Sequence, residues 1–458
     1  MDILPENARH FVALLECLEP YVTLTTLKQF SRIANAILAM TGRVTMLGIS
    51  RWAGKGCSYP TVQRFFYTKA IPWAVLFWVF FKQHLYQACH VYLLVGDEVI
   101  VTKAGKITHG LDRFYASLYG RPVPGLSFFA LSLVDVERRK SFPIRVEQMI
   151  RTAEEKAASK AKAEAKKKKP GAEKRTPGRP KGSKNKNKAD VELTPELLRI
   201  KSMVTSLLHL MAGFLSLTYL VLDGHFGNNP ALQMVLQCNL HLISKLRHDA
   251  ALYFPFEDTY GGHGPHPKYG QRLDCSNIPE KYLKAISTEK NIQTRIYQAE
   301  MLHKEFNRAL NVVIIHKTNL KTGAWAHVIL FSSDLKLSYD KVIDYYCLRF
   351  QIEFNFRDAK QYWGLEDFMN VTETAVTNAA NLSLFMVNLS YQLLSDFRQS
   401  DPQASILDLK AYCRGHKYVQ ETIKLLPEKP EPILLIHIFN QVACLGRIHV
   451  SEPVPNPI

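Results

Sequence analysis

The chain has 458 residues, of which 47% are hydrophobic and 22% charged, so it can bury a sizeable core and is expected to hold two or three structural units. Its formal net charge of +17 favours an acidic polymer as partner. A membrane is disfavoured, because the longest apolar run, residues 71–81, is far shorter than the roughly 20 residues that span a bilayer, and a buried helix is expected there.

Residues 1–88 are predicted to form a helical domain, because apolar residues recur at helical spacing and glycines punctuate the segment. One predicted helix of this domain follows a glycine turn and carries Arg64 and Lys69. Basic side chains on a small helical unit favour contact with DNA, although any helical bundle also has basic surface residues.

Residues 89–150 contain three runs typical of strands. The first, residues 91–95, is almost wholly apolar, as in a central strand, and Asp97 follows it. An acid at this point can reach a metal ion without being buried unpaired, while the alternative is a hairpin with a solvated aspartate. Glu98 is the less favoured ligand, because it should point to the opposite side of the strand.

Residues 151–190 differ in character from the rest of the chain. They hold fifteen Lys or Arg residues against five Asp or Glu residues, and we predict a disordered basic insertion. The sequence TPGRPKGSK resembles an AT-hook, in which Arg179 and Lys181 would lie in a narrow minor groove. A solvated spacer is the alternative.

Residues 191–250 repeat the pattern of an apolar strand that ends on an acid. A predicted helix over 192–217 leads into the apolar residues 219–222, which Asp223 follows directly. A helix is expected from Pro230 and a further strand over 241–250. His225 is a weaker ligand candidate, because sites for hard cations are rich in oxygen.

The rest of the chain is divided into three further parts. Residues 251–332 alternate in hydrophobicity and predict a β-rich insertion, residues 333–370 contain a predicted helix with Glu353, and residues 371–458 are predicted to be helical. Eight cysteines without a Cys-x-x-Cys pair, and no visible secretory signal, predict a reduced cytoplasmic protein.

The predicted helix from Lys341 to Trp363 places four side chains on one narrow face, namely Tyr346, Arg349, Glu353 and Lys360. A carboxylate beside two cations suits a divalent metal ion next to a polyanion, because arginine and lysine bind phosphate. An amphipathic helix with an ordinary ladder of ion pairs is the alternative.

The spacing of these four residues, with the flanking RFQIEFNFRDAKQYWGLE, resembles the signature of transposases of the insertion sequence four family, which are DDE enzymes. The segments around Asp97 and Asp223 also resemble the family's first and second catalytic segments. Two departures are Phe350, where many relatives have tryptophan, and Val99, where they often have threonine.

The resemblance implies an α/β fold: a ribonuclease H-like mixed sheet with flanking helices, a β-rich insertion before the catalytic Glu helix and an N-terminal helical domain. It implies that Asp97, Asp223 and Glu353 are catalytic and hold Mg²⁺, for which Mn²⁺ can substitute. The residues expected to contact DNA are basic or aromatic, namely Tyr346, Arg349, Lys360, Arg179, Lys181 and Lys103.

The function expected from these residues is metal-dependent cleavage at transposon ends and strand transfer into target DNA. The implied partners are double-stranded DNA and a second copy of the chain, in the nucleoid-associated cytoplasm of a bacterium. Two alternatives remain open: a metal-dependent nuclease without strand transfer, and a catalytically inactive DNA-binding protein derived from a transposase.

Overall fold

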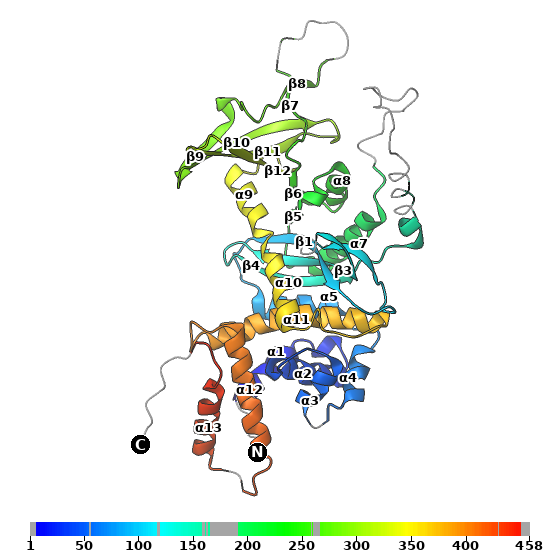
Figure 1. Cartoon of the computed structure of the whole chain (residues 1–458), viewed down its shortest axis with the longest axis vertical. Helices are drawn as coiled ribbons and strands as arrows, with labels where there is room; N and C mark the ends of the chain where they lie inside the picture. Colours follow the sequence, from blue (N-terminus) through cyan, green and yellow to red (C-terminus); the bar gives the residue numbers. More distant parts are fainter. Residues whose placement is uncertain are drawn as a thin grey trace.

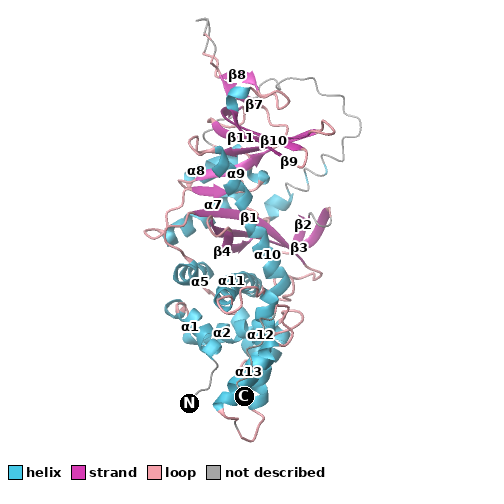
Figure 2. Ribbon diagram, turned by 90° about the vertical axis from the view of Figure 1, so that its left-hand side faces the viewer, coloured by secondary structure: helices cyan, strands magenta, loops and turns pink. Residues whose placement is uncertain are grey.

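The computed structural model describes residues 6–54, 56–116, 120–157, 161, 164, 191–257, 259, 266–428 and 430–449. These residues form an elongated molecule with a mixed sheet and its flanking helices in the middle (Figure 1). Further strands lie at one end, and helices from both ends of the chain lie together at the other, as the view turned by 90° also shows (Figure 2). The predicted AT-hook-like residues Arg179 and Lys181 lie outside the described residues.

Five strands form the centre of the sheet. Strands β1 (Tyr92–Thr102), β3 (Arg121–Asp135) and β4 (Lys140–Gln148) are antiparallel neighbours, and β5 (Tyr219–Val221) and β6 (His241–Leu246) run parallel to β1 on its other side. The order β4-β3-β1-β5-β6 is that of a ribonuclease H-like sheet, so the predicted fold class is confirmed.

The central strands are apolar on both faces because helices cover them. Every residue of β3 from Gly125 to Asp135 is buried. Helices α5 (Trp73–Phe80) and α11 (Glu373–Phe397) pack against β4, and Asn388 of α11 donates a hydrogen bond to the carbonyl oxygen of Pro143 (2.8 Å). Pro143 lies where the register of β3 and β4 shifts, a position at which a sheet tolerates proline.

The predicted β-rich insertion is present and extends the same sheet. Strand β12 (Trp325–Ser332) pairs antiparallel with β6, and the sheet continues outward through four further strands that pair in turn, with β9 against β10. These strands are β11 (Leu310–Asn319), β10 (Ile292–His303), β7 (Leu252–Pro255) and β8 (Tyr269–Arg272), while β9 spans Leu283–Glu289. A short 3-10 helix, η5 (Glu280–Tyr282), precedes β9.

Two helices lie before and after strand β5 in the chain. Helix α7 (Pro195–Met211) precedes β5, and helix α8 (Asn229–Gln237) connects β5 to β6. Both helices have a side-chain cap at their first turn, because Thr194 accepts a hydrogen bond from Leu197 N and Asn228 accepts one from Ala231 N.

The N-terminal and C-terminal helices form one unit at the end of the molecule opposite the insertion (Figure 1). Its helices are α1 (Glu6–Glu16), η1 (Glu19–Tyr21), α2 (Leu24–Ala39), α3 (Met46–Ala53), α4 (Tyr59–Phe66), α12 (Ile406–Ile423) and α13 (Pro432–Cys444). Lys410 and Arg414 of α12 donate to the carbonyl oxygens of Ile37 and Ala39 at the end of α2 (2.6 and 3.2 Å). The N-terminal and C-terminal helices are therefore joined by hydrogen bonds to the free carbonyl groups at the C-terminal end of α2.

The apolar run at residues 71–81 is a buried helix, as predicted. Helix α5 buries five of its eight residues, and a π-helical turn, η2 (Phe81–Leu85), continues it. No helix among the described residues is both long enough and apolar enough to cross a membrane.

Two local predictions were wrong, and one strand was missed. The predicted single helix from Lys341 to Trp363 is two helices, α9 (Tyr339–Leu348) and α10 (Gln351–Tyr362), because the turn between them tightens and Phe350 N bonds to Cys347 O (3.1 Å). The helix predicted over 192–217 is the shorter α7. A strand that was not predicted, β2 (Asp112–Ala116), pairs with the first half of β3.

Candidate active site

Asp97 lies where strand β1 continues beyond its parallel neighbour. The last pair between β1 and β5 joins Val95 to Val221, whereas β1 runs on to residue 102. At Gly96 a Cβ atom would lie 2.8 Å from the ring of Phe129 and 2.9 Å from the side chain of Leu222. The glycine therefore allows β1 to pack closely against the residue that precedes Asp223.

Asp223 follows the neighbouring strand and starts a short 3-10 helix, η4 (Gly224–Phe226). Its Oδ1 accepts a hydrogen bond from His225 N (3.1 Å), and its carbonyl oxygen accepts one from Ser244 Oγ (2.7 Å). Because β5 lies beside β1 and runs parallel to it, Asp97 and Asp223 both lie two residues beyond the last β1–β5 pair, at the same level of the two strands.

Glu353 lies in the first turn of α10, and Arg349 joins it to Asp97. Arg349 Nη1 lies 2.5 Å from Asp97 Oδ2, and Nη2 lies 3.3 Å from Glu353 Oε1. Asp97, Asp223 and Glu353 all line one cleft of about 630 Å³, together with Arg349. The fold thus places in one cleft three acids that are separated by 126 and 130 residues in the sequence, although their carboxylate oxygens do not all lie within 4.8 Å of one another.

Burial sets the electrostatics of this cleft. Burial raises the pKa of Asp97 from 3.8 to about 6, because the loss of hydration destabilises the carboxylate more than the nearby Arg349 guanidinium stabilises it. Repulsion from Asp223 and Glu353 also raises this pKa. A divalent cation bound among the three acids would relieve both effects, so their all-oxygen donor set fits such an ion.

Lys360 and Tyr346 surround the acids in different ways. Lys360 lines the cleft, and its Nζ donates to Ile100 O (2.8 Å) and pairs with Glu366 Oε1 (2.9 Å). Tyr346 is half-buried outside the lining of the cleft, under the Arg349 guanidinium, whose carbon lies 5.9 Å from the ring centre. Burial raises the pKa of the Tyr346 phenol, so it remains a hydrogen-bond donor.

Lys103 does not line the cleft. Its Nζ donates to the carbonyl oxygens of Glu366 (3.1 Å) and Phe368 (2.7 Å) and lies 3.6 Å from the centre of the Phe368 ring. Burial lowers the pKa of Lys103 to about 8. In this structure Lys103 holds the loop after α10, and its contact with DNA stays a prediction.

The cleft also contains residues that the sequence analysis did not identify. Arg357 follows Glu353 by one helical turn, a spacing that could have revealed it, and its side chain is 59% exposed. Tyr115 is exposed on the unpredicted strand β2 and lines the same cleft. Its position depends on the β2–β3 pairing, which no pattern in the sequence indicates.

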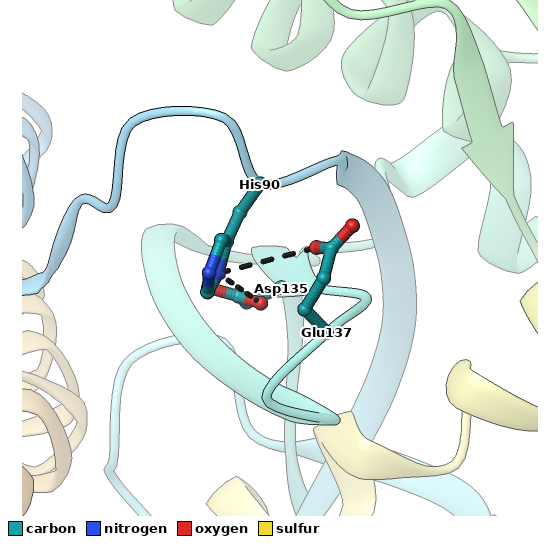
Figure 3. A group of neighbouring side chains, drawn as sticks. All are labelled: His90, Asp135 and Glu137. Atoms are coloured by element: carbon teal, nitrogen blue, oxygen red, sulfur yellow. Dashed lines mark hydrogen bonds and ion pairs between the residues drawn. The ribbon is translucent and has the colours of Figure 1, made fainter.

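A second group of potential metal ligands lies at the start of β1, away from the cleft. Among the described residues, only His90, Asp135 and Glu137 have ligand atoms that all lie within 4.8 Å of one another (Figure 3). Asp135 is fully buried, and its carboxylate accepts hydrogen bonds from Arg138 N (2.9 Å) and Arg138 Nε (2.7 Å). Because Asp135 is fully buried and both its oxygens already bond to Arg138 and His90, the group fits a structural network at the β3–β4 turn better than a metal site.

The fold places this chain among the ribonuclease H-like proteins. Residues 17–304 match the family model described as "DDE superfamily endonuclease", so the chain belongs to this family. Its membership supports a transposase-type nuclease that acts on DNA and uses divalent metal ions. The matched residues include Asp97 and Asp223 and end before Glu353, and none of the curated proteins matches the chain.

Proposed function

We propose that the chain is a DNA transposase of the insertion sequence four family that cleaves transposon ends and transfers them into target DNA. The observation that carries this proposal is the cleft that Asp97, Asp223 and Glu353 share with three cationic side chains, namely Arg349, Arg357 and Lys360. In addition, the spacing of Tyr346, Arg349, Glu353 and Lys360 resembles the family signature.

Asp97, Asp223 and Glu353 would hold Mg²⁺, with Mn²⁺ as a substitute. When bound, such ions activate water and stabilise the leaving oxygen of an in-line phosphoryl transfer. Glu353 is 43% exposed and Asp97 19%, so the acids can meet a ligand that enters from the open side of the cleft. Cleavage at an element end frees a 3′ hydroxyl, which then attacks a phosphodiester of the target.

The cationic residues of the cleft would position the DNA backbone. Arg349 can hold a phosphate by two hydrogen bonds, and Lys360 adds a point charge about two turns after Glu353. Lys360 is itself oriented by Ile100 O on β1, so its position depends on the strand that carries Asp97. Tyr346 would donate a further hydrogen bond.

The remaining parts of the chain would bind DNA away from the cleft. In the helical unit at residues 1–88, Arg64 lies in the last turn of α4, and Lys69 follows that helix. The segment with Arg179 and Lys181 is proposed to add affinity through the minor groove. Two copies of the chain would hold the two element ends, in the nucleoid-associated cytoplasm of a bacterium.

The experiment uses a plasmid that carries the inverted repeats flanking the gene, incubated with the protein and Mg²⁺. The proposal predicts cleavage at the repeats and joined products with a second plasmid, and it predicts neither for the Asp97→Asn variant. Cleavage without joining would support the alternative of a nuclease, and DNA retention without any cleavage would support an inactive DNA-binding descendant. Parental cleavage by Asp97→Asn would refute the site assignment.

A further inference from the structure

The Arg349 side chain is buried between two of the acids. It is only 14% exposed, and its two terminal nitrogens contact different carboxylates, Asp97 and Glu353. Its third nitrogen, Nε, is buried without a hydrogen-bond partner. A buried donor without a partner is costly, so this position of the guanidinium is held by the two carboxylates and not by a complete set of hydrogen bonds.

The guanidinium and a divalent cation would compete for the same oxygens. Arg349 contacts Asp97 Oδ2 and Glu353 Oε1, and both residues belong to the proposed metal-binding set. Two cations cannot both approach these oxygens closely, because their mutual repulsion is strong in a partly buried site. Binding of the ion through these two oxygens therefore requires Arg349 to leave at least one carboxylate.

A DNA phosphate can take over the released guanidinium. Arginine binds phosphate through two parallel hydrogen bonds, and Arg349 lines the open cleft in which DNA would lie. Tyr346 lies beneath the guanidinium, whose carbon is 5.9 Å from the ring centre. The Arg349 side chain thus exchanges a carboxylate partner for a phosphate.

We propose, on the basis of the function proposed above, that Arg349 is a positioning residue that couples DNA binding to metal loading. Without DNA, Arg349 neutralises Asp97 and Glu353 and weakens the binding of divalent cations. With DNA, a backbone phosphate draws Arg349 away and frees the carboxylates for the ion. By linkage, DNA then strengthens metal binding and metal strengthens DNA binding by the same factor.

The test measures Mn²⁺ binding to the full-length protein by electron paramagnetic resonance at pH 8, without DNA. Arg349→Gln should bind Mn²⁺ roughly tenfold more tightly than the wild type, because it removes the competing cation. Arg357→Gln is the matched control: it removes the same charge from the same cleft, but Arg357 pairs with Asp358. Its affinity should stay close to that of the wild type.

A second measurement needs only the wild type and guards against a variant that fails to fold. A duplex of the flanking inverted repeat should strengthen Mn²⁺ binding to the wild type several-fold, and it should have little effect on Arg349→Gln. The inference is overturned if Arg349→Gln binds Mn²⁺ no more tightly than the wild type, or if DNA leaves the wild-type affinity unchanged. Metal-dependent cleavage by the wild type would survive either result, so the proposed function is tested separately.

Discussion

The raised pKa of Asp97 predicts that a catalytically damaging substitution stabilises the fold. Asp97→Asn keeps the size of the side chain and removes its charge. In the folded protein the carboxyl has a pKa of about 6, against 3.8 for the ordinary side chain. This difference corresponds to about 3 kcal/mol of unfolding free energy, at 1.36 kcal/mol for each tenfold change in the ionisation constant.

The pH dependence of the stability follows from the raised pKa of Asp97. The protonated carboxyl is the form that the folded cleft favours, so the wild type loses this stability as the pH rises from about 4 through 6. The substituted side chain of the Asp97→Asn variant does not ionise, so the variant keeps this stability at high pH. In the absence of divalent metal, the variant should therefore be close to the wild type at pH 4 and more stable by up to about 3 kcal/mol at pH 8.

Urea unfolding, followed by circular dichroism in EDTA at both pH values, measures this difference. Groups distant from Asp97 titrate alike in both proteins, so their contributions cancel in the comparison. Glu98→Gln is the control, since it removes an exposed carboxylate from the same strand and should lack the gain. A gain that is absent at pH 8, or equal at both pH values, would refute the account of a desolvated Asp97.

Three further predictions concern the site, the core and the basic segment. Glu353→Gln, or chelation of the metal, should reduce end cleavage in a plasmid assay by roughly 100-fold or more while gel shifts still detect DNA binding; retained cleavage would contradict the assignment. Gly364→Ala should lower the unfolding free energy by roughly 1–3 kcal/mol in a denaturant titration, because Gly364 has a φ of +84° and its Cβ would lie 2.5 Å from Val44 Cβ; wild-type stability would show that the contact relaxes. Replacing Arg179 and Lys181 by alanine should reduce the slope of log affinity against log salt by about 2, and an unchanged slope would mean that neither contacts phosphate.

The core of the fold was predictable from the sequence because its strands are buried on both faces. The apolar runs before Asp97 and Asp223 are long enough to identify, and each of these acids is the first residue after the run that is not buried. Strand β2 was missed because it is short and its burial alternates, with the charged Asp112 and Arg113 at its start.

The partners of the site residues could not be predicted in the same way. Arg349 pairs with Asp97, which lies 252 residues away, and Lys103 reaches Phe368 over 265 residues. Such pairs depend on how the sheet and the helices dock, and helical periodicity carries no information about docking. The break between α9 and α10 could not be predicted either. Phe350 has a right-handed helical conformation at the break, so no glycine or proline is needed there to mark it in the sequence.

The central claim is that three distant acids bind one set of divalent cations on DNA. Iron-directed hydroxyl-radical cleavage tests it, with Fe²⁺, ascorbate and peroxide added to the DNA-bound protein. The account predicts backbone cuts beside Asp97, Asp223 and Glu353 together, all suppressed by excess Mg²⁺. Cuts beside one acid alone, or only beside His90 and Asp135, would contradict it.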